Sequence, residues 1–186
     1  VRSPYPRGML TNQAKAASQP PIRIGHGYDL HRLDAVRPAG EGRPLVLGGV
    51  RVPAVAGERE MGPVAHSDGD ALIHAITDAV LGAMGMPDIG QLFPDTDPRH
   101  QGADSAAFLV EAVARVRSAG WEVVNLDATV ILERPRIGGV KEAIRGNVAR
   151  LLGVGVDRVN VKGKTHEGVD SVGQGLAVEV HAVVLM

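Results

Sequence analysis

Some segments of this chain space their apolar residues as a helix does, and others have the apolar pattern of strands. The order of these segments favours a β-sheet covered by helices. Residues 67–84 place apolar side chains three and four positions apart, as one buried helix face requires; these are Leu72, Ala75, Ile76, Ala79, Val80 and Ala83. The stretches 104–120 and 138–153 are also typical of helices. Apolar and β-branched residues predict strands at 22–31, 43–52, 122–132, 158–164 and 176–185. This order predicts an α/β fold (an α+β sandwich), with a mixed β-sheet and helices packed on one face.

The predicted domain covers residues 22–186, a length that can enclose one hydrophobic core. Residues 1–21 hold four prolines and three basic residues but no acidic residue, which predicts a disordered N-terminal extension. This extension has three possible origins: a natural tail, a processed transit segment or an expression remnant. Within the domain, we expect Ser67 or Asp68 to cap the first helix and Asp104 the second. Residues 85–104 form a long loop between them.

Composition limits the chemistry open to this chain. It has no cysteine, so a transition-metal site must use histidine and carboxylate ligands. Its 20 lysines and arginines nearly balance its 21 aspartates and glutamates, so we expect no nucleic acid and no membrane as partner. Its apolar runs fall short of the roughly 20 residues that cross a bilayer, and the N-terminus lacks the apolar core of a signal peptide. We therefore expect a cytoplasmic protein with a small polar substrate, or a plastid protein if residues 1–21 are a transit remnant.

The segment GHGYDLH, residues 25–31, contains one half of a candidate metal site. Side chains two positions apart share a face of a strand, so Asp29 and His31 point the same way. On the following helix, His74 falls on the side opposite the apolar stripe. Two ligands close together in the sequence and one distant histidine make three, which is the number of protein ligands at a catalytic zinc ion. The fourth position is left for substrate. The alternative is that all three are solvated polar residues on outer faces.

Two further segments could bind phosphate. His66 and Ser67 stand just before a helix start, where backbone N–H groups and the helix dipole attract anions, unless Ser67 only caps the helix. Residues 160–168, NVKGKTHEG, end a strand with two lysines, a threonine and Glu167. Lysine and threonine donate to phosphate oxygens, and a single carboxylate beside phosphates is a usual ligand of Mg²⁺. The alternative for this segment is a charged turn.

The loop segment FPDTDP, residues 93–98, adds two carboxylates, Asp95 and Asp97. Proline restricts the backbone at both ends of this turn. Aspartate side chains commonly accept hydrogen bonds from the backbone of such turns. A turn-stabilising role and a direct contact with the substrate are therefore both open.

Several segments form a family pattern when they are taken in order. They are RIGHGYDLHRL, LVLGGVRVP, AHSDGDALIHAITDAVLGAMGMPDIGQLFPDTDP, GADS, ERPRI and VNVKGKTHEGVDSVGQG. Together they resemble the 2-C-methyl-D-erythritol 2,4-cyclodiphosphate synthase family of the non-mevalonate pathway of isoprene and terpenoid biosynthesis. The resemblance spans about residues 22–185, and HSDGDALIHAITDA followed by DIGQLFPDTDP is its most specific part. It implies a lyase that converts 4-diphosphocytidyl-2-C-methyl-D-erythritol 2-phosphate into the 2,4-cyclodiphosphate and CMP.

The resemblance also implies roles for individual residues. The zinc ligands match Asp29, His31 and His74, and the ligand of a second divalent ion, Mg²⁺ or Mn²⁺, matches Glu167. The catalytic positions match His66, Thr165 and Glu167. The substrate-binding positions match Asp29, His31, His66, Ser67, Asp88, Ile89, Gly90, Asp95, Leu132, Pro135, Arg136, Ile137, Lys164 and Thr165. Among them, His66 and Ser67 match a phosphate-contacting pair, and the segment LERPRI matches the cytidine site.

The resemblance further implies a homotrimer whose sheets face the trimer axis. Its active sites would lie at subunit interfaces, with the zinc side from one chain and the cytidine side from its neighbour. The family commonly has Arg and Glu where this chain has Gln174 and Leu176, near an axial cavity that can bind isoprenoid diphosphates. Because glutamine offers no charge to a diphosphate, we do not expect that ligand here.

Two other functions are open at this point. A zinc-dependent hydrolase would hold a water molecule in the open metal position and would release a linear product. A non-catalytic trimer would bind a cytidine nucleotide or an isoprenoid diphosphate without forming CMP. The product of the reaction separates these alternatives from a cyclodiphosphate synthase.

Overall fold

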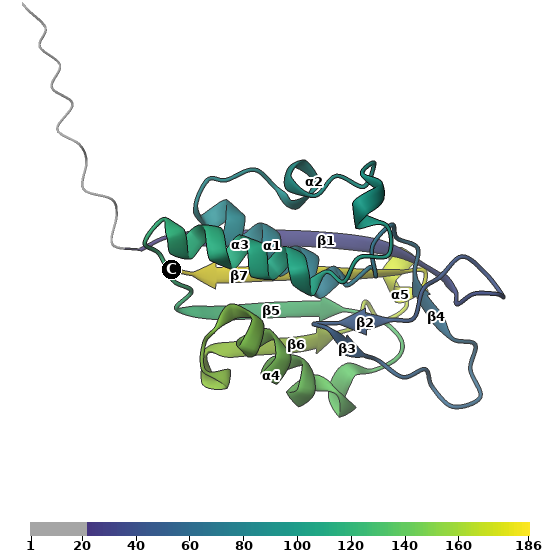
Figure 1. The fold of residues 1–186 in the computed structure, drawn as a ribbon. Helices are drawn as coiled ribbons and strands as arrows, with labels where there is room; N and C mark the ends of the chain where they lie inside the picture. Colours follow the sequence, from purple (N-terminus) through teal and green to yellow (C-terminus); the bar gives the residue numbers. More distant parts are fainter. Residues whose placement is uncertain (1–21) are drawn as a thin grey trace, which may run out of the picture.

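A computed structural model describes residues 22–186, so the predicted N-terminal extension over residues 1–21 lies outside the described residues. Its centre is a five-stranded sheet in the order β4-β1-β7-β5-β6 (Figure 1). The strands are β1 (Ile24–Ala35), β4 (Met61–Pro63), β5 (Asn125–Ile131), β6 (Val159–Lys164) and β7 (Ala177–Leu185). β1 runs antiparallel to β4 and β7, while β5 is antiparallel to β7 and parallel to β6. The predicted mixed sheet is therefore confirmed.

Helices cover one face of this sheet, as predicted (Figure 1). The long ones are α1 (Ala71–Ala83), α3 (Ala106–Ser118) and α4 (Lys141–Leu152). α1 packs on β1 and β7, α4 packs on β6, and α3 lies against α1 and α4. The short ones are α2 (Ile89–Leu92), α5 (Asp170–Gly173) and the 3-10 turns η1 (Pro98–His100), η2 (Ile137–Gly139) and η3 (Val156–Arg158). No helix within residues 22–186 is long and apolar enough to cross a membrane.

Two glycines of β1 allow α1 to lie directly against the strand. A Cβ atom added to Gly25 would lie 1.8 Å from the carbonyl oxygen of Ala79, and one added to Gly27 would lie 1.8 Å from that of Ala75. No side chain fits into that space, so the close approach of helix and strand requires glycine at both positions. This approach also brings His74, the neighbour of Ala75, next to the strand residues that follow Gly27.

The expectation of a single strand over residues 43–52 is wrong. This segment forms a two-stranded hairpin, β2 (Val46–Leu47) and β3 (Val50–Arg51), separate from the main sheet. Gly48 and Gly49 form its turn with φ angles of 61° and 74°. Two successive positive φ angles are typical of a type I′ turn, which a Gly-Gly pair favours. The structure also adds β4, whose three residues are too few to show a hydrophobic period.

The start of α1 corrects a second expectation. Asp70, and not Ser67 or Asp68, caps this helix, and its side chain accepts a hydrogen bond from the backbone N–H of Ile73 at 3.0 Å. The same carboxylate accepts from the backbone N–H groups of the two turn glycines at 2.9 and 2.6 Å. Asp70 is fully buried and joins the helix to the β2–β3 turn. Its carboxylate therefore takes the place that an external phosphate would need at this helix start.

The face of the sheet opposite the helices carries exposed apolar side chains. On β1 these are Ile24, Tyr28 and Leu30, with exposed fractions of 69%, 47% and 47%, and on β7 Val183 is 42% exposed. The strand register pairs Ile24 with Leu185, Tyr28 with His181 and Leu30 with Glu179, so apolar and polar side chains lie next to each other on this face. Exposed apolar side chains gathered in this way are typical of an interaction surface.

Candidate metal centre

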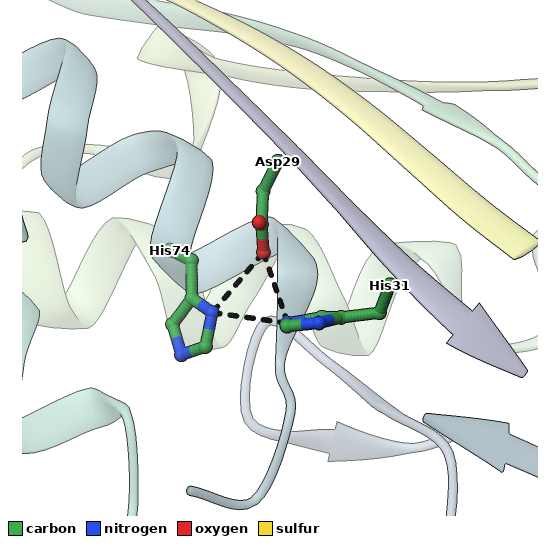
Figure 2. Close-up of side chains that lie close together, drawn as sticks. All are labelled: Asp29, His31 and His74. Carbon is green, nitrogen blue, oxygen red and sulfur yellow. Dashed lines mark hydrogen bonds and ion pairs between the residues drawn. The ribbon is translucent and has the colours of Figure 1, made fainter. Parts of the chain in front are cut away.

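Asp29, His31 and His74 meet where α1 lies against β1 (Figure 2). Asp29 Oδ2 is 3.1 Å from His31 Nε2 and 3.1 Å from His74 Nδ1, and the two nitrogens are 3.2 Å apart. Within residues 22–186, these residues are the only group of three possible histidine or carboxylate ligands that converge in this way. All three are partly buried. The structure thus brings together the strand pair and the distant helical histidine, as the metal hypothesis requires.

The three donor atoms fit a tetrahedral zinc ion. With bonds of roughly 2.0–2.1 Å from zinc to nitrogen and oxygen, the donor atoms of a tetrahedral site lie roughly 3.3 Å apart. The observed separations of 3.1, 3.1 and 3.2 Å are close to that value. Two imidazoles and one carboxylate are ligands that zinc accepts, and three protein donors leave the fourth position for a substrate or water.

The charges of these side chains favour an ionised carboxylate between two imidazoles. Burial opposes the ionisation of Asp29, but hydrogen bonds from His31 and His74 outweigh it and hold the pKa of Asp29 well below its usual value. Burial alone would lower the pKa of His74, yet its hydrogen bond to Asp29 and the negative charge there raise it. A bound divalent cation would replace the protons that these groups otherwise share.

The other ring nitrogen of His74 is also hydrogen-bonded. His74 Nε2 lies 2.8 Å from the hydroxyl oxygen of Ser105 and 3.3 Å from that of Ser67. Ser105 is fully buried at the start of α3. This serine belongs to the GADS motif, from which no role was expected for it. It lies 31 positions from His74, and no spacing rule connects residues so far apart.

A pocket of about 440 Å³ opens beside the metal ligands His31 and His74. Its lining also includes His66, Ser67, Ile89, Gly90 and Asp95, all of them predicted substrate contacts. His66 Nε2 is buried and has no hydrogen-bond partner among the described residues. Because buried polar atoms are nearly always paired, this nitrogen is suited to a bound ligand.

Asp88, another predicted substrate contact, stands at the edge of this region and is exposed. It caps α2, where its carboxylate accepts from the backbone N–H of Gln91 at 2.8 Å. Asp78 of α1 holds the same loop, because its carboxylate accepts from the backbone N–H of Ile89 at 2.7 Å. Burial raises the pKa of Asp78. The loop that carries Ile89 and Gly90 is thus fixed one helical turn beyond His74.

The two carboxylates of the segment FPDTDP have different environments. Asp97 accepts hydrogen bonds from the backbone N–H of Arg99 at 2.9 Å and from its guanidinium at 2.6 Å. These bonds lower the pKa of Asp97 to about 2. Asp97 therefore stabilises the turn, while Asp95 lines the pocket beside the metal ligands.

A second pocket, of about 530 Å³, lies at the carboxyl ends of the parallel strands β5 and β6. Ligands commonly bind at this end of parallel strands. Six residues predicted to bind substrate or metal line it: Leu132, Arg136, Ile137, Lys164, Thr165 and Glu167. Pro135, also a predicted substrate contact, does not line this pocket. It lines a neighbouring pocket together with Gln174 and Leu176.

The two predicted halves of the site are separate on one chain. The two pockets share no lining residue. The metal ligands come from β1 and α1, whereas the second pocket belongs to β5 and β6, and β7 lies between β1 and β5. At roughly 4.8 Å between neighbouring strands, β1 and β6 are roughly 14 Å apart.

Comparisons with known proteins agree on one family. The YgbB family model matches residues 22–186. The chain is 51% identical over 174 residues to the chloroplastic 2-C-methyl-D-erythritol 2,4-cyclodiphosphate synthase of Oryza sativa, covering 92% of this chain and 73% of the rice protein. It is 50% identical over 165 residues to the synthase of Trichlorobacter lovleyi, covering 89% and 98%. A solved structure of such a synthase in a CDP-bound form superposes with a TM-score of 0.76 at 42% identity, covering 88% of this chain and all of that one.

Proposed function

The chain belongs to the YgbB family of 2-C-methyl-D-erythritol 2,4-cyclodiphosphate synthases, and from this we propose how its residues carry out the family's reaction. The protein is a lyase of the non-mevalonate route to isoprenoids. It converts 4-diphosphocytidyl-2-C-methyl-D-erythritol 2-phosphate into 2-C-methyl-D-erythritol 2,4-cyclodiphosphate and CMP. We assign this activity to one domain, residues 22–186. We place the active site here because Asp29, His31 and His74 converge beside a pocket.

The reaction is an internal phosphoryl transfer. An oxygen of the 2-phosphate forms a bond to the β-phosphorus of the cytidine diphosphate group. The bond from that phosphorus to the bridging oxygen breaks, and its electron pair leaves with CMP. Both reacting groups are anions, so the protein must hold them in line and neutralise their charge. The attacking phosphate is largely ionised at neutral pH, and we assign no general base.

On the metal side, we propose that Asp29, His31 and His74 hold one zinc ion. When bound, zinc supplies a Lewis acid that polarises a β-phosphate oxygen at its open coordination position. His66 and Ser67, in the wall of the same pocket, would donate hydrogen bonds to phosphate oxygens. The buried and unpartnered Nε2 atom of His66 supports its catalytic role.

The methylerythritol group would occupy the pocket beside the metal ligands. Gly90 would offer its backbone groups to the hydroxyls of this group, and Asp95 would offer a carboxylate. Ile89 would offer only its carbonyl oxygen, because its N–H already donates to Asp78. Asp88 would complete this set, because a carboxylate has acceptor capacity beyond the bond from Gln91 that it already accepts. The hydrogen bond from the backbone of Ile89 to Asp78 supports this placement, since it holds the loop against α1.

The cytidine diphosphate group would occupy the pocket at the ends of β5 and β6. Lys164 and Thr165 would donate to its phosphate oxygens. Glu167 would bind the second divalent ion, Mg²⁺ or Mn²⁺, which would supply positive charge to offset that of the departing CMP. Backbone groups of the segment 132–137 would hold the cytidine; its predicted contacts are Leu132, Pro135, Arg136 and Ile137. The position of Glu167 in one pocket with Lys164 and Thr165 supports this placement.

We propose that three chains assemble with their sheets facing a common axis. The exposed apolar side chains on the open sheet face support this arrangement, because assembly would cover them. The separation of the two pockets on one chain supports active sites at the subunit interfaces, with the metal side from one chain and the Glu167 side from its neighbour. We keep the expectation that the axial region near Gln174 and Leu176 binds no isoprenoid diphosphate.

For location we propose the cytoplasm, with a plastid as the alternative if residues 1–21 are a transit remnant. The relative from rice is named as chloroplastic, and the bacterial one carries no such word in its name. Import of a fluorescent fusion that carries residues 1–21 into isolated chloroplasts would favour the plastid, and exclusion would favour the cytoplasm.

One assay tests the proposed function against its two rivals. The purified protein is supplied with 4-diphosphocytidyl-2-C-methyl-D-erythritol 2-phosphate, Zn²⁺ and Mg²⁺, and the products are followed by phosphorus NMR. A synthase forms CMP and the cyclic diphosphate in equal amounts. CMP together with the linear 2,4-bisphosphate would instead establish a hydrolase, and binding of CMP without turnover would establish a non-catalytic protein.

A further inference from the structure

A short hydrogen-bond chain leads from the metal centre into the protein interior. His74 Nε2 lies 2.8 Å from Ser105 Oγ, and the Ser105 hydroxyl donates to Asp68 Oδ1 at 2.5 Å. An ionised carboxylate only accepts hydrogen bonds, so the hydroxyl hydrogen of Ser105 is committed to Asp68. The oxygen of Ser105 is then left to accept a hydrogen bond from His74. The direction of the chain requires the proton of His74 on Nε2.

This direction leaves the other nitrogen of His74 free for a metal. When a bound cation replaces the proton that Nδ1 shares with Asp29, the neutral imidazole keeps its other proton on Nε2 and offers the lone pair of Nδ1. Nδ1 is the atom that faces Asp29 and His31 in Figure 2, at 3.1 and 3.2 Å. A histidine ligand that donates its second N–H to a fixed acceptor is held in one tautomer and one ring orientation.

Ser105 does not serve the helix at whose start it lies. Serine at the first position of a helix normally caps it with its side chain, yet Ser105 makes no such bond to α3. Asp104, the predicted cap, lies one residue before this position, and its side chain accepts from the backbone N–H of Ala106 at 2.9 Å. The side chain of Ser105 is thus used entirely for His74 and Asp68.

Asp68 fixes the position of Ser105 from a second direction. Its Oδ2 atom accepts from the backbone N–H of Ser105 at 3.1 Å, and its own N–H donates to the carbonyl of Ala103 at 3.0 Å. Ser105 is fully buried, so water does not compete for its hydroxyl. Ser67, the other neighbour of His74 Nε2, lies farther away at 3.3 Å and also accepts from the backbone N–H of Gly69.

We propose that Ser105, held by Asp68, is a positioning residue for the metal centre. It would keep His74 in the tautomer with a free Nδ1 and aim the ring at the point shared with Asp29 and His31. The inference rests on the metal site proposed above, but it does not depend on which reaction that metal serves. Partners of this kind typically contribute 10- to 100-fold to metal affinity.

Zinc binding tests this inference directly. The dissociation constant for Zn²⁺ is measured by competition with a chromophoric chelator for the wild type and for Ser105→Ala. We expect a 10- to 100-fold weaker constant for the variant. The visible spectrum of the Co²⁺-substituted protein should change as well, because the ring of His74 is no longer fixed. Ser105→Thr, which keeps a hydroxyl, should restore most of the affinity.

Thr77→Val is the matched control. Thr77 lies on the same helix as His74, is also fully buried, and donates its hydroxyl to the carbonyl of Ile73 at 2.8 Å. The substitution removes a buried hydroxyl that makes no contact with His74, so the affinity for zinc should stay within about twofold of the wild type. If Ser105→Ala does not fold, Asp68→Asn replaces it in the test and should also weaken zinc binding.

The possible outcomes separate this inference from the metal proposal. A wild-type protein that binds no zinc would overturn both. A wild type that binds zinc, together with Ser105→Ala or Asp68→Asn proteins of unchanged zinc affinity and cobalt spectrum, would overturn only the role of Ser105. Equal losses in Thr77→Val and Ser105→Ala would also overturn it, because the effect would then be a general one of lost buried hydroxyls.

Discussion

Asp29 Oδ2 and His74 Nδ1 lie 3.1 Å apart although 45 positions separate the two residues in the chain. The contact exists because α1 lies directly on β1, with the carbonyl oxygens of Ala75 and Ala79 against the two glycines of the strand. The packing of one helix on one strand therefore determines whether the metal ligands can meet.

The glycine at position 27 should be essential for that contact. Gly27→Ala would place a Cβ atom 1.8 Å from the carbonyl oxygen of Ala75, so the helix must move away from the strand. We expect a loss of about 3 kcal/mol or more in the free energy of unfolding, measured by urea denaturation, and a loss of zinc binding. Gly146→Ala is the control, because no atom lies within 4 Å of its added Cβ; it should be neutral or stabilising. An equally stable Gly27→Ala protein that binds zinc normally would refute the packing argument.

The carboxylate of Glu167 should matter for turnover and not for zinc. Glu167→Gln removes the charge proposed to bind the second divalent ion, while the three proposed zinc ligands lie in another part of the chain. We expect an unchanged zinc content and a turnover reduced at least tenfold, with a shifted dependence on Mg²⁺ concentration. Glu142→Gln, the same substitution at an exposed carboxylate on α4, should behave like the wild type. Normal turnover of Glu167→Gln across all magnesium concentrations would show that Glu167 holds no catalytic ion.

The proposal that active sites are shared between chains predicts complementation. His74→Ala chains lack the metal side and Glu167→Gln chains lack the other side, so each variant alone should be nearly inactive. When the two are unfolded, mixed in equal amounts and refolded together, roughly one interface in four should combine two intact halves. Turnover should then recover to roughly a quarter of the wild-type value per site. Recovery near zero in mixed trimers verified by mass spectrometry would place both halves of the site in one chain.

The buried cap of α1 predicts an unusual pH dependence of stability. Burial outweighs the hydrogen bonds from three backbone N–H groups and raises the pKa of Asp70 to about 6, above the value of about 4 in an unfolded chain. Between pH 4 and pH 6, Asp70 therefore keeps its proton in the folded state, whereas in the unfolded state it has already released it. The stabilisation is fully present below pH 4 and is lost as the pH rises through 6.

Asp70→Asn provides the measurement, because the amide has no proton to release in this range. The difference in unfolding free energy, wild type minus variant, should fall by up to about 3 kcal/mol between pH 4 and pH 7 and stay constant above. Carboxylates that do not interact with Asp70, such as Asp78, titrate in both proteins and cancel in the difference, whereas the effects of Asp70 on Asp68 and His74 remain in it. A difference that does not change with pH would mean that Asp70 is ionised in the folded state throughout this range.

The sequence predicted the parts of this structure that depend on local periodicity. Alternation placed Asp29 and His31 on one face of a strand, and helical spacing separated His74 from the apolar stripe. The same spacing suggested a solvated outer face for His74, but α3 packs against α1 and His74 is partly buried between them. Periodicity describes one element at a time and cannot show what a second helix covers.

Other features could not be predicted because they depend on contacts between distant segments. The role of Gly25 and Gly27 follows only from the position of α1. Asp70 was not expected as the helix cap, because its bonds to the β2–β3 turn do not appear in the local pattern. Ser105 was only part of the GADS motif, and only the structure shows its bond to His74. The Gly48–Gly49 pair is different: a Gly-Gly pair favours a type I′ turn, so the hairpin could have been read from the sequence, although a single strand was predicted there.

The central claim is that Asp29, His31 and His74 hold one divalent metal ion on which cyclisation depends. The most direct test measures zinc content and formation of the cyclic diphosphate in the same samples: wild type, chelator-treated wild type, the same protein after zinc is restored, and His74→Ala. We predict about one zinc per chain in active wild type, loss of both zinc and product after chelation, recovery with zinc, and a folded His74→Ala protein that recovers neither. A metal-free wild type or a His74→Ala protein that forms the cyclic diphosphate at the full wild-type rate would contradict the claim.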